Sequence, residues 1–383
     1  MSMVKRNGFF WGVSSAVLLL AGVAHAGLSA TKPAGLLVFP KLVVTENEDT
    51  LIQVSNTADE PVHVRCYLVN ANAHCSNNPQ QVCSSSEECG GGICIPGWSE
   101  TDFRFTLTRR QPIVWRLSEG LPGNQFPLDG IFNIGPGGQF NQDSNIPPAP
   151  EFPFQGEMKC FQVDENDNPV ARNDLKGEVT LVVTTGAPPV LVDVAKYNAI
   201  GLGSLGVNDG NDTLCLGGNG PTPDCPEAEY DGCPNILIVD HFFDGAPDPQ
   251  SGTAISSNLT LVPCSQDFLT QSVFKTTVQF LVFNEFEQRL STSIRIQCFD
   301  SRPLSDIDTR AGTSDDFASI FNIAVQGTLA GQSRLRAVQT SETDKGHGIL
   351  AVLRESHGTT SAAVNVHFAG IRDQGDVIRA PRQ

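Results

Sequence analysis

Short apolar runs separated by turn-forming residues dominate this chain and constrain its fold more than any other feature. Residues 51–56 and 61–69 come close to strict alternation of apolar and polar side chains, which is typical of strands with one buried face. Similar runs follow in both halves of the chain, with Gly, Pro, Asn and Asp between them. The sequence therefore predicts an all-β protein.

The first 26 residues predict a signal peptide rather than a part of the fold. Lys5 and Arg6 precede an apolar run at residues 9–23, and the small residues Ala24 and Ala26 provide a cleavage site. An uncleaved anchor is the alternative, but the run is short for a membrane span. No later segment is long and apolar enough to span a membrane, so we expect an exported protein without a transmembrane segment that is periplasmic, cell-surface or extracellular.

The charge of the chain limits the classes of partner. It carries 25 Lys and Arg against 42 Asp and Glu, a formal net charge of -17. Such a charge repels phosphate backbones, so we expect no nucleic-acid partner. A protein or a glycan at a cell surface is the expected partner.

Short sequence features recur in the same order in the two halves, which predicts an internal duplication. The matched features are Pro40 with Pro263, Asn56 with Asn284, Cys66 with Cys298, residues 131–134 with 320–323, Gly156 with Gly331, and Gly177 with Gly348. Chance recurrence of short apolar words in two β domains is the alternative. Each copy would have about seven strands, the size of an immunoglobulin-like β-sandwich. We predict a first sandwich at residues 27–200, a Gly- and Asp-rich linker at 201–234, and a second sandwich at 235–383.

Eleven cysteines follow the predicted cleavage site, and export favours disulfides over zinc. Four of them, Cys75, Cys83, Cys89 and Cys94, lie in a predicted insert at residues 71–97. The insert resembles small disulfide-knotted modules, including the four-disulfide-core type, without matching any of them. Its four cysteines are expected to pair among themselves in one of three connectivities. It would serve as a binding loop or simply as a stabilised insertion.

The other seven cysteines are assigned from their predicted strands. The expected bridges are Cys66–Cys160, Cys264–Cys298 and Cys225–Cys233. This leaves Cys215 as the free thiol, which could join two chains.

Two groups of oxygen and nitrogen ligands are candidate metal sites. Asp240, His241 and Asp244 would bind a metal only if the strand ended there, because alternation places Asp240 and His241 on opposite faces. The alternative is an ordinary exit from strand to loop. His347 and His357, with His367, would bind zinc only if the last strands brought them together.

The run from Asp164 to Pro169 resembles the calcium-binding linker motif of cadherins. The resemblance implies that Asp164, Asn166, Asp167 and Asn168 hold calcium, the one cofactor that the sequence offers. A hairpin turn explains the same residues.

No G-x-S-x-G or H-E-x-x-H motif occurs. The sequence therefore favours an exported structural or interaction protein with a surface, adhesive or assembly role and without catalytic activity. One alternative is a carbohydrate-binding or carbohydrate-active protein, which needs Trp98, Trp115 or Tyr67 exposed in a row. Another is a metal-dependent enzyme built on Asp240, His241 and Asp244.

Overall fold

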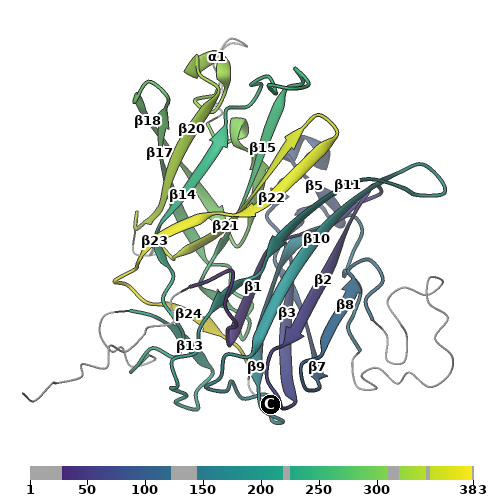
Figure 1. The fold of residues 1–383 in the computed structure, drawn as a ribbon, viewed down its shortest axis with the longest axis vertical. Coiled ribbons are helices and arrows are strands. Elements are labelled where there is room, and N and C mark those ends of the chain that lie inside the picture. The colour runs from purple at the N-terminus through teal and green to yellow at the C-terminus, as the bar shows by residue number, and fades with distance from the viewer. Residues whose placement is uncertain (1–27, 122–144, 219–224, 309–318, 342–345, 382–383) are drawn as a thin grey trace, which may run out of the picture.

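The computed structural model describes residues 28–121, 145–218, 225–308, 319–341 and 346–381. The predicted signal peptide and the repeated word at residues 131–134 lie outside these ranges. The described chain is almost all β, as predicted, with several separate sheets (Figure 1).

The first half holds a five-stranded and a four-stranded antiparallel sheet. The five-stranded order is β12(Ile200–Leu202), β1(Leu36–Val44), β9(Phe154–Val163), β3(Val62–Asn70) and β7(Ser99–Leu107). The four-stranded order is β11(Val190–Asn198), β10(Leu175–Thr185), β2(Glu48–Asn56) and β8(Pro112–Arg116). Alternate residues of both sheets meet in one hydrophobic core, with Leu37 and Val64 from the first sheet and Ile52 and Val179 from the second.

The second half also holds a five-stranded and a four-stranded antiparallel sheet. The five-stranded order is β23(His367–Ile371), β14(Pro234–Phe242), β20(Ala330–Val338), β17(Lys275–Asn284) and β18(Arg289–Gln297). The four-stranded order is β22(Thr360–Asn365), β21(Ile349–His357), β15(Ile255–Pro263) and β19(Asp300–Pro303). Val239, Phe280, Leu261 and Leu353 belong to the core that these sheets share.

Strand for strand, the two halves have the same order when β1 is matched with β14 and β12 with β23. Gly156 on β9 then matches Gly331 on β20, and each lies opposite the last residue of the neighbouring strand, Asn70 or Asn284. This glycine match agrees with the sequence analysis. Asn284 therefore corresponds to Asn70, and the expected match with Asn56 is wrong.

Two more of the expected matches are wrong. Pro40 lies on β1 and Pro263 on β15, which are not equivalent strands. Cys66 lies on β3, the counterpart of β17, whereas Cys298 follows β18. Pro and Asn are common where strands end in any β protein. The same short sequence features therefore recur at the ends of strands that are not equivalent in the two halves.

A small third sheet contradicts the expectation that residues 201–234 form a linker with little core content. It consists of β13(Thr213–Leu216), β24(Asp376–Arg379) and β16(Gln266–Asp267). Leu214, Leu216 and Tyr230 from the expected linker are buried, and Gly201 belongs to β12. The pairing of β13 with β24, more than 150 residues further along the chain, supplies the burial that the local sequence lacks.

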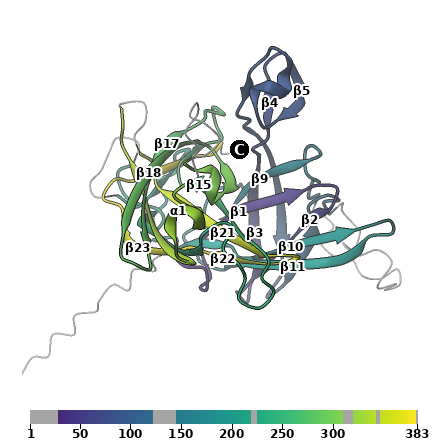
Figure 2. The same ribbon diagram turned by 90° about the horizontal axis from the view of Figure 1, so that it is seen from above.

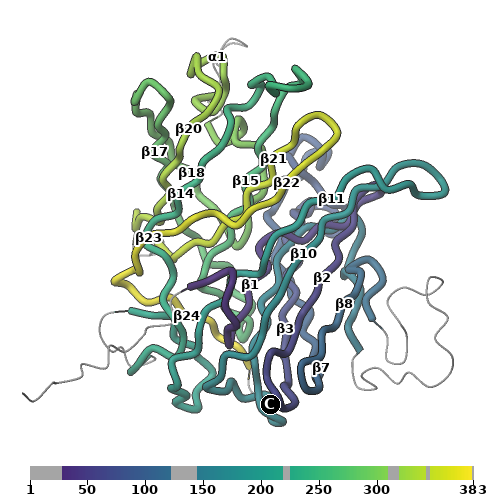
Figure 3. Tube along the Cα trace, viewed as in Figure 1, coloured from purple at the N-terminus to yellow at the C-terminus, as the bar shows by residue number. Residues whose placement is uncertain are grey.

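The halves also share a hydrophobic cluster of their own. β1 is buried on both faces: Leu37 and Phe39 point into the first core, and Leu36 and Val38 point into this shared cluster. The cluster also takes in Phe268 from the second half. Elsewhere β11 and β22 run side by side (Figure 3), where the side chain of Asn365 bonds the backbone of Asn198 at both its N–H and its carbonyl.

The cysteine-rich insert projects from the first half (Figure 2). It contains β4(Ala73–Cys75), β5(Asn78–Cys83), the turn of 3-10 helix η1(Ser86–Cys89) and β6(Cys94–Ile95). Glu151 holds its base by accepting hydrogen bonds from Asn70 and Asn72 and by pairing with His74. The described helical segments outside the insert are short: η2(Leu304–Asp306) and α1(Ile323–Gln326).

Candidate functional site

Asp240, His241 and Asp244 do not converge, so the predicted metal site is wrong. His241 is 4% exposed and points inward, where Nε2 lies 2.8 Å from Ser333 Oγ. Burial lowers the pKa of this imidazole. Asp240 lies on the opposite face and accepts a hydrogen bond from Gln332. Asp244 accepts hydrogen bonds from two backbone N–H groups, at 2.8 and 2.9 Å, and so holds the exit from β14, as the alternative predicted.

The segment from Asp164 to Asn168 forms a local turn after β9 rather than a calcium cage. The expected hairpin between the Cys160 and Gly177 strands is wrong, because β9 and β10 belong to different sheets. Asp164 Oδ1 accepts the backbone N–H groups of Asn166 and Asn168 at 2.8 and 2.9 Å. These bonds hold the pKa of Asp164 below its usual value. Asp167 turns away from Asp164 and pairs with Arg65 and Arg104. Because the two carboxylates point to different partners, they do not form a shared cation site.

The three C-terminal histidines are held apart by separate partners. His347 contacts Ser265, His357 lies between Asp248 and Glu355, and His367 is exposed on β23. Zinc needs ligands that converge, and these imidazoles do not.

The expected row of exposed aromatic rings is also absent from the described residues. Tyr67 and Trp115 are each 1% exposed, and Trp115 lies in the first core. Tyr67 stacks on Phe268 with ring centroids 4.3 Å apart, and the ring of Trp98 also packs on Phe268, at 6.1 Å. Tyr67 and Trp98 therefore join the two halves, and Trp115 packs inside the first half.

The described cysteines form five disulfides. They are Cys66–Cys160, Cys75–Cys89, Cys83–Cys94, Cys215–Cys225 and Cys233–Cys264. The first agrees with the predicted pairing, and the next two are one of the three connectivities expected in the insert.

The predicted pairings Cys264–Cys298 and Cys225–Cys233 are wrong. The free thiol is Cys298, which is buried, and Cys215 is bonded. The error has a structural cause. Cys215 lies on β13 of the third sheet and pairs with Cys225, whereas Cys233 just before β14 pairs with Cys264 just after β15. Neither pairing can be read from local sequence.

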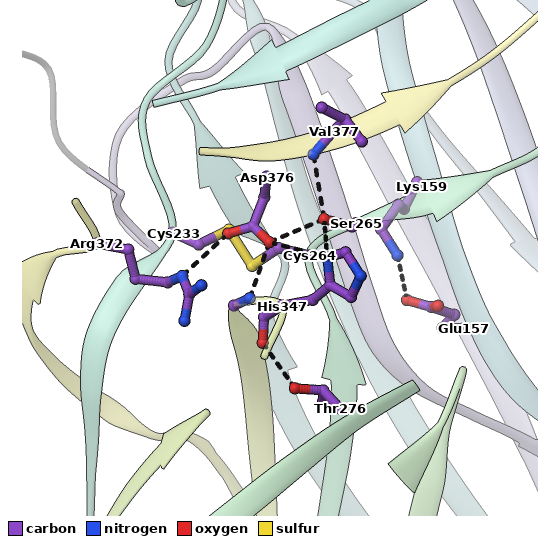
Figure 4. Close-up of a disulfide and its surroundings, with 11 residues drawn as sticks. Glu157, Lys159, Cys233, Cys264, Ser265, Thr276, His347, Arg372, Asp376 and Val377 are labelled. Carbon is purple, nitrogen blue, oxygen red and sulfur yellow. Dashed lines mark hydrogen bonds and ion pairs between the residues drawn. A yellow bond between two sulfur atoms is a disulfide. The ribbon is translucent and has the colours of Figure 1, made fainter. Parts of the chain in front are cut away.

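The Cys233–Cys264 disulfide lies beside a buried cluster of charged and polar groups (Figure 4). Asp376 accepts hydrogen bonds from Ser265 Oγ and from the Gly348 N–H, both at 2.8 Å, and lies 3.3 Å from the Arg372 guanidinium. Ser265 is 0% exposed, so it cannot reach a substrate as a nucleophile. Cys233, Cys264 and Asp376 lie close enough to hold a metal, but both sulfurs are used in the disulfide. This cluster anchors the beginning of β24.

An open groove of about 550 Å³ lies at one end of the five-stranded sheet of the second half. The half-buried rings of Phe242 and Phe283 line it together with the carboxylates of Asp240, Glu285 and Glu355. It belongs to the outer face of β18, β17, β20, β14 and β23, which we call the open face. The groove can receive an aromatic-stacking or hydrogen-bonding group from a partner.

The open face differs from its counterpart in the first half, which is covered. There, Glu157 and Lys159 point out from β9, are 0% exposed, and form an ion pair of 2.7 Å. Gln266 from the second half donates a hydrogen bond to Glu157. Burial lowers the pKa of Lys159 and raises that of Glu157. Of the two equivalent five-stranded sheets, the first therefore has a covered outer face, whereas the outer face of the second is not covered by any of the described residues.

Sequence analysis did not identify the open face. The signal was present, because Ser291, Ser293 and Arg295 alternate with Thr292, Ile294 and Ile296 at the start of the strand expected at residues 291–299. What the sequence could not show is that this polar side remains uncovered.

The chain matches no family model and no curated protein. No helix among the described residues is long and apolar enough to cross a membrane.

Proposed function

We propose that this protein is an exported interaction protein without catalytic activity. Its frame would be two immunoglobulin-like β-sandwiches that arose by internal duplication. The shared strand order of the two halves supports the duplication, and the five disulfides are compatible with export. In this proposal the frame is rigid and one of its faces is presented to a partner.

The observation that carries the proposal is the difference between the two equivalent five-stranded faces. The face in the first half is covered by the third sheet and by residues of the second half. The open face of the second half retains exposed charged side chains and half-buried rings. A sheet face of this size that stays uncovered while its counterpart is buried is a candidate binding surface.

The insert is a second candidate surface. Two disulfides cross-link it internally, and Ile93 and Ile95 are 61% and 48% exposed on it. Exposed apolar residues on a disulfide-held loop suit a protein contact.

Site-specific photo-crosslinking on the surface of the producing cells tests the proposal. A photoreactive residue is placed at Ser293 on the open face, at Ile93 on the insert, or at Thr180 on β10 as a control. We expect adducts from Ser293 or Ile93 and none from Thr180. Equal labelling at all three positions, or no adduct at any of them, would contradict an interaction role.

A further inference from the structure

Five cationic side chains gather on the open face. Alternation along three neighbouring strands points one residue in two outward. The outward cations are Lys275 on β17, Arg289 and Arg295 on β18, and Arg334 and Arg336 on β20. All five are exposed. A chain with 42 acidic residues and 25 basic ones therefore concentrates cations on one sheet.

These cations have no acidic partner in the part of the chain that the structure describes. None of the five forms an ion pair with a carboxylate of the described residues, whereas most other described lysines and arginines do, such as Arg104 with Asp167. Arg336 donates a hydrogen bond to Gln279, and Arg334 lies 5.7 Å from the centre of the Phe283 ring. Neutral partners hold the two guanidinium groups in place and leave their charge available.

The spacing of the cations suits an extended anion. Arg334 and Arg336 are two residues apart, which is about 7 Å along a strand, and Arg289 and Arg295 are six apart, about 20 Å. A polymer with anionic groups at regular intervals can meet several of them at once. Small polar side chains lie between the cations, with Ser291 and Ser293 exposed on the same strand.

From these contacts we propose that the open face binds an anionic polysaccharide. Arginines would pair with its sulfate or carboxylate groups, and serine and glutamine side chains would bond its hydroxyls. The carboxylates of Asp240, Glu285 and Glu355 mark the end of the face where an anion is repelled. The inference rests on the proposed interaction role and names the class of partner for one surface.

The net charge of the protein does not prevent this binding at physiological salt. The Debye length is about 8 Å at 0.15 M ionic strength, so carboxylates on the far side of the molecule are screened. Binding should therefore be measured near 0.15 M, because at low salt the acidic remainder of the molecule opposes the ligand.

A pair of polymers that differ only in charge tests the proposal. Immobilised dextran sulfate should retain the oxidised full chain at 0.15 M salt, and neutral dextran of the same length should not. Replacement of Arg295, Arg334 and Arg336 by Gln should weaken binding to dextran sulfate by about tenfold, the loss expected from three exposed ion pairs.

The matched control replaces Arg109, Arg110 and Arg116 by Gln. Arg109 and Arg110 are exposed and Arg116 is half-buried. All three are already paired with Asp59, Asp49 or Glu119 in the first half, and their loss changes the net charge by the same amount. Binding should change by less than about twofold. Thermal unfolding of both variants shows whether they remain folded.

Three results would overturn the proposal. They are no retention on dextran sulfate, an equal loss of binding in the control variant, and binding to poly-L-glutamate as tight as to dextran sulfate, since that polymer has no sugar hydroxyls. Self-association that is abolished by the open-face variant would assign the face to a second copy of this chain and overturn the glycan. Adducts from Ser293 on cells that coincide with a failure on dextran sulfate would refute the glycan and leave the interaction role standing.

Discussion

At the scale of single residues, Cys298 shows how a free thiol is selected by its surroundings. The odd number of cysteines predicts one unpaired thiol, but the choice of Cys298 over Cys215 depends on the third sheet, which the local sequence does not predict. Burial raises the pKa of Cys298 well above its usual value, and Glu157 raises it further. The thiolate that reacts with disulfide reagents is therefore suppressed in the native protein.

We predict that 5,5′-dithiobis(2-nitrobenzoic acid) at pH 8 labels no thiol in the native protein and one thiol per chain in guanidinium. Cys298→Ala should abolish the signal in both conditions. Labelling of Cys215, established by peptide mapping, would contradict this assignment and restore the prediction made from sequence.

Glu100 makes stability depend on pH. Its pKa is raised from 4.5 to about 7 by burial and, to a smaller extent, by the nearby Asp102, against the opposing effects of Arg65 and a hydrogen bond with Gln271. The folded protein therefore keeps a proton between pH 4.5 and 7 that the unfolded chain has released, and stability falls as the pH rises through this window.

We expect the urea midpoint of the unaltered protein to decrease from pH 4.5 to 8, and that of Glu100→Gln to decrease less. The variant should be more stable at pH 8 by about 1 kcal/mol, once solvent screening of this half-buried carboxyl is allowed for. Glu46→Gln, at an exposed loop position, is the control. Parallel profiles for the Glu100 variant and the unaltered protein would rule out this role.

At the scale of elements, most strands could be predicted and their partners could not. In β2 and β17 the residue pattern matches the observed burial: buried residues alternate with half-buried residues along both strands. β13 has only four residues, and its partner β24 lies near the end of the described chain. Such a short segment has no readable period, so composition alone suggested a linker. The open face could not be predicted for a similar reason. A sequence shows which residues lie on the same side of a strand, but it does not show what covers that side.

The C-terminal strand β24 should therefore contribute to stability far more than its length suggests. Ile378 is 0% exposed in the cluster shared by the halves, whereas Ile371 on β23 is 52% exposed. We predict that Ile378→Ala lowers the free energy of unfolding by about 2–5 kcal/mol, and that Ile371→Ala lowers it by less than about 0.5 kcal/mol. Chemical denaturation measures both. Equal effects of the two substitutions would show that β24 is not a structural part of the shared cluster.

At the scale of the whole molecule, the two halves are joined by both polar and apolar contacts. Lys41 on β1 reaches across and donates hydrogen bonds to Asn258 Oδ1 and Ser301 Oγ, both at 2.9 Å, and to Thr260 Oγ1 at 3.2 Å. Its burial lowers the pKa of this lysine to about 8. The sequence predicted two similar halves, but it could not predict this arrangement, because the contacts that join them link residues more than 200 positions apart.

Loss of the Phe268 side chain should weaken the coupling between the two halves, so that they unfold separately. It belongs to the second half, is 2% exposed, and stacks on Tyr67 of the first half. Because one cluster serves both halves, we expect the unaltered protein to unfold in a single calorimetric transition with equal calorimetric and van't Hoff enthalpies.

Phe268→Ala should cost about 3–5 kcal/mol and divide this transition into two, because each half retains a core of its own when the shared cluster is weakened. Phe286→Ala is the matched control, since Phe286 is 67% exposed in the turn between β17 and β18 and should leave the single transition unchanged. Two transitions in the unaltered protein would mean that the halves unfold independently, and the covered face of the first half would then be stabilised by the third sheet alone.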